Sequence, residues 1–249
     1  TASYDAASST STSLVFKYTI LANQTDASGI SIPAGSIALN GGTIADAAGN
    51  AATLTHTGAL DNASYLVDTT SPTVSSVAIT GATGIQNSTL NAGDVVSVTV
   101  TMSEAVTVTG TPQLALNIGG TTVQANYASG SSTSTSLVFT YTILAGQTDT
   151  NGISIGANSL GLNGGTIADA AGNAATITHS AVADNASYLV DTTAPTVSSV
   201  AISSATGAQN STLNVGDVVS VTVTMSEATT VTGTPQLTLN VGGTSRVAS

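Results

Sequence analysis

Asp94–Ser103 reads DVVSVTVTMS, and this stretch decides the fold. Apolar side chains occupy every second position, and small hydroxyl side chains occupy the positions between them. A two-residue period of this kind is typical of a β-strand with one face buried and the other in water. The side chains expected to face the core are Val96, Val98, Val100 and Met102, and those expected to face solvent are Ser97, Thr99 and Thr101.

The rest of the chain carries strand signals of the same kind and no helical period. Leu137–Ile143 alternates in the same way, and turn signals rich in Gly and Asn, such as Asn163–Gly165, separate the apolar stretches. Many short strands between such turns predict an all-β fold of antiparallel β-sandwiches. Further strands are expected at Thr73–Thr80, Pro112–Ile118, Thr121–Tyr127, Ala175–His179 and Ala186–Val190.

The chain repeats itself with a period of 123 residues. Tyr4–Ile20 reads YDAASSTSTSLVFKYTI, and Tyr127–Ile143 reads YASGSSTSTSLVFTYTI. The same offset carries Asp68–Pro72 onto Asp191–Pro195. A period this long indicates an array of whole domains rather than a solenoid of small units.

The repeat also predicts the domain boundaries. The proline-containing links that begin at Asp68 and Asp191 mark the junctions, so residues 68–190 are expected to form one complete sandwich. Residues 1–67 correspond to the back part of a sandwich, and residues 191–249 to the front part of another. Two explanations stay open. The chain is a window of a longer array, or the two parts complement each other between chains by strand exchange.

The order of several motifs resembles bacterial Ig-like tandem repeats of giant secreted surface adhesins, including those exported by type I secretion. The resemblance rests on Gly93–Gly120, Leu137–Ile155, Leu162–His179 and Asn185–Val197, and it covers the whole chain through the repeat. It implies a rod of Ig-like sandwiches outside the cell, frequently stiffened by calcium at the junctions. The chain has no tryptophan and no cysteine, so any kinship with antibody domains is one of architecture only.

Composition excludes several functional classes. The net charge is −11, and Lys17 and Arg246 are the only basic residues, so the phosphate backbone of a nucleic acid would be repelled. The absence of cysteine removes disulfides and thiol chemistry. No apolar run approaches the roughly 20 residues that span a bilayer, and no membrane insertion is expected.

The acidic residues are few, and nearly all recur at the 123-residue offset. Treating Ala175–His179 and the last strand of the repeat as antiparallel neighbours places Asp169 at the same end as Asp191. The front strands of the next repeat bring Glu227 to that end as well. On this reasoning two sets of carboxylates are expected to converge at junctions, namely Asp169, Asp191 and Glu227, and Asp46, Asp68 and Glu104.

Carboxylate oxygens are the ligands that Ca²⁺ prefers, and no basic side chain lies near enough in sequence to neutralise either set. The sequence therefore predicts calcium at the junctions. The competing interpretation is that these carboxylates are solvated turn residues that keep the array soluble. Asp149–Gly152 resembles the start of a calcium loop but lacks the remaining ligands, and an ordinary Asx turn is expected there.

Catalysis finds little support in the sequence, and no enzymatic activity is expected. His56 and His179 are the only histidines, one in each repeat, and are expected to be edge residues rather than metal ligands or bases. The expected function is that of an extracellular extender in a bacterial adhesin or matrix protein, with neighbouring repeats as its partners. A self-assembling filament or surface-layer subunit, built from copies of the chain, is the alternative. A carbohydrate-binding module is a third hypothesis, but exposed aromatic platforms are missing.

Overall fold

The chain is almost entirely β-structure. The computed structural model describes residues 1–248, and the helical elements among them are two 3₁₀ turns, η1 (Ala6–Ser8) and η2 (Ser129–Ser131). The all-β expectation is confirmed. No helical stretch among the described residues is long and apolar enough to cross a membrane. The chain comprises two compact units, Thr1–Asp191 and the part from Thr192 onward, and each is described by itself.

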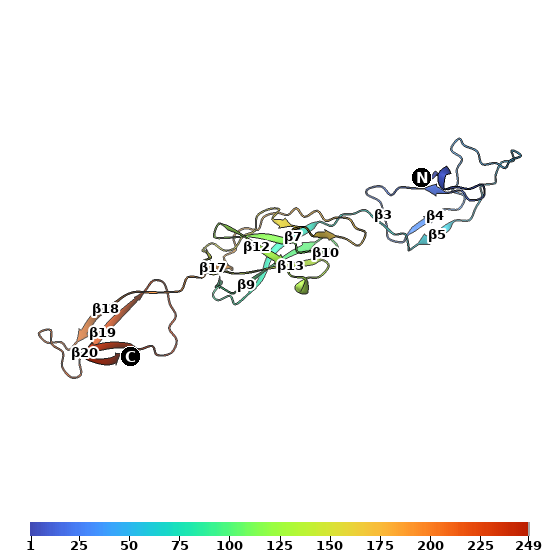
Figure 1. Cartoon of the computed structure of the whole chain (residues 1–249). Coiled ribbons are helices and arrows are strands. Elements are labelled where there is room, and N and C mark those ends of the chain that lie inside the picture. The colour runs from blue at the N-terminus through green and yellow to red at the C-terminus, as the bar shows by residue number, and fades with distance from the viewer. Residues whose placement is uncertain (249) are drawn as a thin grey trace. The chain divides into compact units, whose positions relative to one another are not determined.

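The larger sheet of the central sandwich lies within the first unit (Figure 1). It has six strands in the spatial order β15-β11-β12-β13-β9-β7, and every neighbouring pair is antiparallel. The strands are β7 (Val74–Thr83), β9 (Val95–Met102), β11 (Gln113–Ile118), β12 (Thr121–Tyr127), β13 (Ser136–Thr142) and β15 (Leu160–Gly161).

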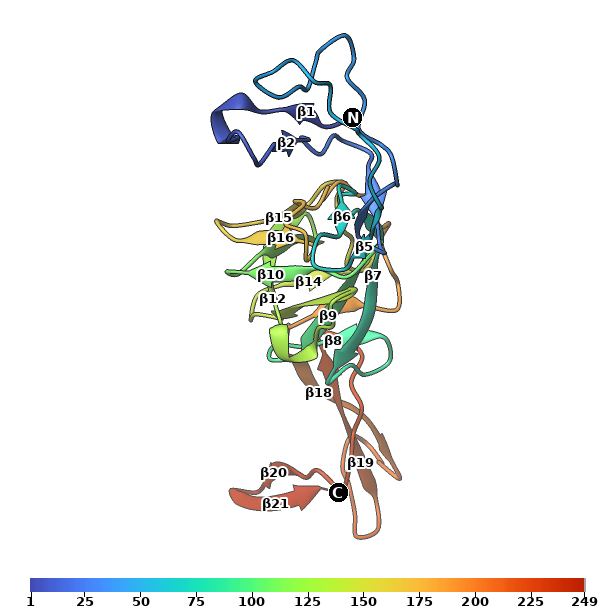
Figure 2. The ribbon, with the colours of Figure 1, turned by 90° about the vertical axis from the view of Figure 1, so that its right-hand side faces the viewer.

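Shorter strands form the second layer of the sandwich (Figure 2). β8 (Thr89–Leu90), β14 (Thr148–Asp149) and β17 (Leu189–Asp191) make a sheet in the order β14-β17-β8, and β10 (Thr107–Thr109) pairs with β16 (Thr166–Ala168). The β17–β8 pair is parallel, which the expected antiparallel pattern did not include. Leu90 and Val190 of this layer share one core cluster with Val98 of the large sheet, which places the core between the layers.

The alternation along β9 produces the expected burial. Val96, Val98 and Val100 are fully buried, whereas the hydroxyl residues between them are only partly buried. β13 lies beside β9 and contributes Leu137 and Phe139, also fully buried. The core therefore consists almost wholly of Val, Leu and Ile around a single phenylalanine, as the scarcity of aromatic residues predicts.

The expected strand at Ala175–His179 is wrong, and that at Ala186–Val190 is shorter than predicted. Between Ala174 and Tyr188 the chain is extended but makes only isolated bridges, such as Thr73 with Thr176 in parallel and Ile155 with Val182 in antiparallel. The turn at Asn185 does not reverse the chain, because the amide of Tyr188 donates to the Asn185 oxygen and pairing with residues 148–155 then continues. Residues 174–191 thus run in one direction along the sandwich.

Residues 1–67 form short strand pairs without a core of their own. The strands are β1 (Ser3–Tyr4), β2 (Phe16–Lys17), β3 (Thr25–Asp26), β4 (Ile30–Ile32), β5 (Ala59–Asn62) and β6 (Val67–Asp68). They pair as β1–β2, β3–β6 and β4–β5. None of the apolar side chains in this segment belongs to the core cluster, and Leu14, Phe16 and Ile32 are exposed.

The second unit repeats the front part of the central sandwich. Its strands are β18 (Val197–Thr206), β19 (Val218–Met225), β20 (Leu237–Val241) and β21 (Thr244–Ala248). β18 pairs with β19 in the register that β7 uses with β9, and both pairs have bulges at corresponding positions. β20 pairs with β21 as β11 pairs with β12. This unit also leaves large apolar side chains exposed, among them Val223 and Val241.

Candidate metal site at an acidic cluster

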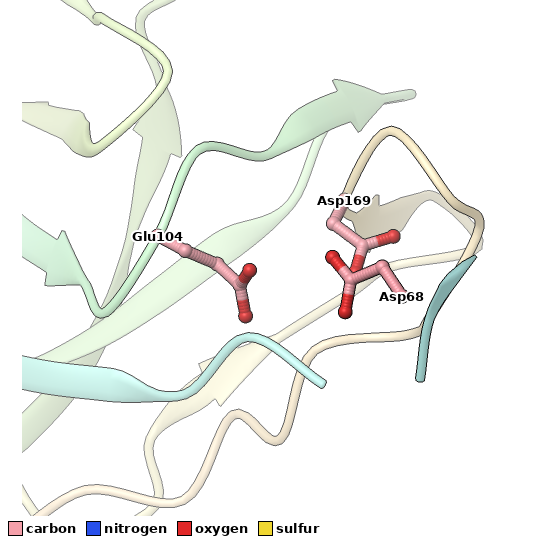
Figure 3. Close-up of side chains that lie close together, drawn as sticks. All are labelled: Asp68, Glu104 and Asp169. Carbon is pink, nitrogen blue, oxygen red and sulfur yellow. The ribbon is translucent and has the colours of Figure 1, made fainter. Parts of the chain in front are cut away.

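Three carboxylates meet at the end of the central sandwich where the chain enters it. Asp68, Glu104 and Asp169 each offer an oxygen atom, and these oxygens all lie within 4.8 Å of one another. Figure 3 shows the three side chains pointing toward one another from three different parts of the chain. Asp68 is exposed, Glu104 is half-buried and Asp169 is 8 % exposed. We call Asp68, Glu104 and Asp169 together the acidic cluster.

Asp68 ends strand β6, so it belongs to the segment that precedes the central sandwich. Its backbone pairs with Thr25 of β3, and one carboxylate oxygen accepts a hydrogen bond from the amide of Thr70 at 2.9 Å. A side chain thus held at both the strand end and the following turn has little freedom to leave the cluster.

Asp169 begins the tight loop after β16, and Asn173 closes that loop. The backbone amide and the side-chain amide of Asn173 each donate to the Asp169 carboxylate at 2.8 Å. The side-chain hydrogen bond from Asn173 is the largest cause that lowers the pKa of Asp169 below its ordinary value, and desolvation by burial opposes it. Asp169 is therefore held in its ionised form.

Glu104 follows β9 and precedes β10. Its neighbours fix the backbone there, because Ser103 donates to the oxygen of Thr73 and Val106 donates to the oxygen of Ser134, both at 2.8 Å. Within residues 1–248, no hydrogen bond to the Glu104 carboxylate is found. The stretch from Asp68 to Val190 contains no Lys or Arg, so no basic side chain of the sandwich compensates the three negative charges.

The spacing of the cluster suits a hard divalent cation. Two oxygens bound to one Ca²⁺ at about 2.3–2.6 Å lie at most about 5 Å apart, and the three carboxylate oxygens meet this limit. Three carboxylates supply at most six of the six to eight oxygens that Ca²⁺ takes, and water can complete the shell. Asp68, Glu104 and Asp169 are thus the residues that would hold the ion.

The structure regroups the predicted ligands. Asp169 lies with Asp68 and Glu104, whereas Asp191 lies in β17, where it pairs with Thr148 at the other end of the sandwich. The expectation that Asp169 converges with Asp191 is wrong. It assumed a reversal between Ala175 and the last strand, but the chain keeps its direction there.

Asp46 is not a member of the acidic cluster, although the sequence grouped it with Asp68 and Glu104. As the counterpart of Asp169, it accepts hydrogen bonds within its own loop, from the backbone and side-chain amides of Asn50 at 2.8 Å. The side-chain amide of Asn50 is the main cause that lowers the pKa of Asp46 below its ordinary value. The Asp46 carboxylate therefore stabilises its own loop by hydrogen bonds, as the Asp169 carboxylate does.

Asp191 and Glu227 correspond to Asp68 and Glu104 by the repeat, and they lie in different units. Oxygen Oε1 of Glu227 is buried and has no hydrogen-bond partner in the part of the chain that the structure describes. A buried carboxylate oxygen without a partner is uncommon, because desolvation disfavours the charge. Their convergence on a cation stays a prediction.

The other polar motifs have structural roles. Asp149 is 3 % exposed and accepts from the amides of Asn151 and Gly152, which is the expected Asx turn, and also from the amide of Gly119. His179 accepts from the amide of Ser159 at 2.9 Å through Nε2, while Nδ1 lies 2.8 Å from the oxygen of Ser180. Each ring nitrogen of His179 thus has a hydrogen-bond partner in the neighbouring backbone.

In comparisons with known proteins, no family model, curated protein or solved structure matches the chain.

Proposed function

We propose that the chain is a structural extender, in which tandem sandwiches are tied together by a divalent cation, most suitably Ca²⁺, at their junctions. The proposal combines the 123-residue repeat with the resemblance to Ig-like repeats of secreted bacterial adhesins. Its place is outside the cell, in an adhesin or matrix protein. Its partners are neighbouring repeats, and it has no catalytic role and no affinity for nucleic acid.

The observation that carries this proposal is the origin of the three carboxylates. Asp68 comes from the last strand of the preceding repeat, whereas Glu104 and Asp169 come from loops of the following sandwich. A cation bound by all three would connect β6 to the sandwich through short ionic contacts. Binding would also remove the repulsion between charges that no Lys or Arg neutralises.

A rigid junction is what distinguishes an extender from a flexible string of domains. Among the described residues, one hydrogen bond joins Asp68 to the loop of residues 169–173, from the side chain of Asn173 to the backbone oxygen of Asp68. Such a bond contributes only about 0.5–1.5 kcal/mol and leaves the junction free to open. A cation that gathers three carboxylates would restrict the angle between consecutive repeats.

The test is a calcium titration of the full chain by isothermal titration calorimetry, with small-angle X-ray scattering in calcium and in chelator. We expect binding with a dissociation constant of about 10⁻⁴–10⁻³ M, typical of extracellular modules, and a narrower range of shapes in calcium. Asp68→Asn, Glu104→Gln and Asp169→Asn should each weaken binding at the acidic cluster.

Asp61→Asn is the matched control, because it removes one carboxylate from residues 1–67 outside the acidic cluster. Equal calorimetric and scattering curves for Asp61→Asn and the three cluster variants would defeat the proposal. So would scattering that is unchanged by calcium while calcium binds.

A further inference from the structure

One extended segment connects the two outer strands of the large sheet. The strand order puts β7 and β15 at opposite edges of that sheet. On the β7 side, the backbone oxygen of Thr176 accepts a hydrogen bond from the amide of Val74 at 3.3 Å. Further along the segment, His179 binds residues 158–160, which lead into β15. Residues 174–182 thus bridge from one edge of the sheet to the other.

The imidazole ring of His179 binds the backbone through both of its nitrogens. Nε2 lies 2.9 Å from the amide nitrogen of Ser159 and 3.3 Å from that of Leu160. Nδ1 lies 2.8 Å from the backbone oxygen of Ser180. The ring therefore ties the start of β15 to the segment that bridges the sheet.

These partners determine which ring nitrogen carries the proton. A carbonyl oxygen can only accept, so Nδ1 must be protonated to donate to Ser180. A backbone N–H can only donate, so Nε2 must be unprotonated to accept from Ser159 and Leu160. The contact therefore requires the neutral ring with its single proton on Nδ1.

The same arrangement occurs at His56, the counterpart of His179 in the repeat. Nε2 of His56 accepts from the amide of Ser36 at 3.0 Å, and Nδ1 lies 2.7 Å from the backbone oxygen of Thr57. Both partners correspond, by the 123-residue offset, to partners of His179. The requirement for a neutral ring is thus a feature of the repeat.

Protonation of the His179 ring would place an N–H group at Nε2, facing two backbone N–H groups. A donor that faces donors makes neither hydrogen bond, and the amides of Ser159 and Leu160 would lose their acceptor. No carboxylate is placed to compensate the new charge. The elements around the ring, which are β7, β11 and residues 155–162 and 174–182, contain no titratable residue apart from His179.

We propose that His179 is a pH-sensitive latch, which fixes the start of β15 while the ring is neutral and loosens it when the ring is protonated. Imidazole is the side chain that ordinarily changes charge between about pH 5 and 8. The contact is present at the upper end of this range and is lost as the pH falls and the ring takes up a proton.

The opening is local, because the backbone of His179 keeps two hydrogen bonds with Asn158 that do not depend on the charge of the ring. Its effect reaches the core, because Leu160 is only 4 % exposed and belongs to the core cluster. Acidification therefore loosens one edge of the sandwich without unfolding the rest.

The first experiment determines the tautomer of both histidines by long-range nitrogen–proton NMR correlation on the full chain, at about pH 8. We expect the proton on Nδ1 in His179 and in His56. A proton on Nε2 of His179 would overturn the proposal, because Ser159 and Leu160 could then have no acceptor in the ring.

The second experiment measures amide hydrogen exchange at Ser159 and Leu160 by NMR, at about pH 8 and about pH 5, in chelator. After correction for the intrinsic pH dependence of exchange, we expect their protection to fall at least about tenfold in acid. The amides of β9 and β13 should keep their protection. Carboxylates ordinarily titrate near pH 4, so the change between the two pH values reports on imidazole.

His179→Gln removes the charge change and keeps an acceptor. The side-chain oxygen of Gln can accept a hydrogen bond but gains no proton in this range, so protection at Ser159 and Leu160 should no longer depend on pH. His56→Gln is the matched control, because it makes the same substitution in the other repeat. It should leave the pH dependence at Ser159 and Leu160 as in the parent chain.

Two further results would overturn the proposal. One is equal protection of Ser159 and Leu160 at the two pH values, and the other is a pH dependence that survives His179→Gln. Should His179→Gln fail to fold, the tautomer and the exchange of the parent chain still decide. Calcium plays no part in these measurements, so the proposed function is tested separately.

Discussion

The side-chain nitrogen of Asn173 donates a hydrogen bond to the backbone oxygen of Asp68 at 3.1 Å, across 105 positions of sequence. The same nitrogen donates to a carboxylate oxygen of Asp169 at 2.8 Å. One amide group therefore positions two of the three members of the acidic cluster. Asn173 is a positioning residue for the junction, and its counterpart Asn50 holds only its own loop.

Replacing Asn173 by Ala should loosen the acidic cluster without removing a ligand. Partners that orient metal ligands typically contribute 10–100-fold to affinity, so we expect calcium to bind about tenfold more weakly. Calorimetric titration measures this directly. Asn50→Ala removes the equivalent loop contact beside Asp46 and should leave the affinity unchanged. An Asn173→Ala variant that binds calcium as the parent does would contradict the assignment.

The pKa of Asp169 gives an independent measure of the same contact. Because hydrogen bonds from Asn173 lower the pKa in the folded state, the unfolded chain binds the proton more tightly. The resulting stabilisation is complete above the ordinary pKa and is lost as the pH falls through the lowered one. Carboxyl-carbon NMR in chelator should show Asp169 titrating below its ordinary value, and at a higher pH in Asn173→Ala. A titration curve that Asn173→Ala leaves in place would refute this cause.

Period-two patterning was enough to predict the long strands, because burial of one face dominates their energetics. β9, β11, β12 and β13 lie within one residue of the expected ranges. Short elements such as β8 and β14 were missed, since two residues carry no measurable period. The parallel β17–β8 pair was also missed, because pairing direction depends on the path of the connecting chain and not on local pattern.

The sequence singled out the three residues of the acidic cluster as candidate ligands, but it placed them in two different groups. The repeat singled out Asp68, Glu104 and Asp169 because few carboxylates occur and nearly all recur. Assigning them to an end of the sandwich required the direction of residues 174–191, and the assumption that Ala175–His179 and the last strand are antiparallel neighbours was wrong. A turn that kinks a strand and one that reverses it have the same composition, so only the pairing with residues 148–155 separates them.

Gly152 should tolerate no side chain. Its φ is +100°, and a Cβ there would lie 2.1 Å from the backbone oxygen of Asn185. Gly152→Ala should therefore destabilise the central sandwich by at least about 2 kcal/mol, or roughly 5–10 °C in Tm by calorimetry. Gly29 has the same φ and the same approach to Asn62. Gly29→Ala lies outside the core cluster and should leave the main transition of dilute protein in place. Equal shifts for both variants would contradict this.

Phe139 and Phe16 occupy equivalent positions in the repeat, but truncation of Phe139 should cost far more stability than truncation of Phe16. Phe139 is fully buried, so Phe139→Ala should cost about 3–5 kcal/mol of stability in urea unfolding of the central sandwich. Phe16 is 40 % exposed, and Phe16→Ala should change the unfolding of dilute protein by less than about 0.5 kcal/mol. Comparable destabilisation of the dilute chain by both variants would mean that residues 1–67 already have a core.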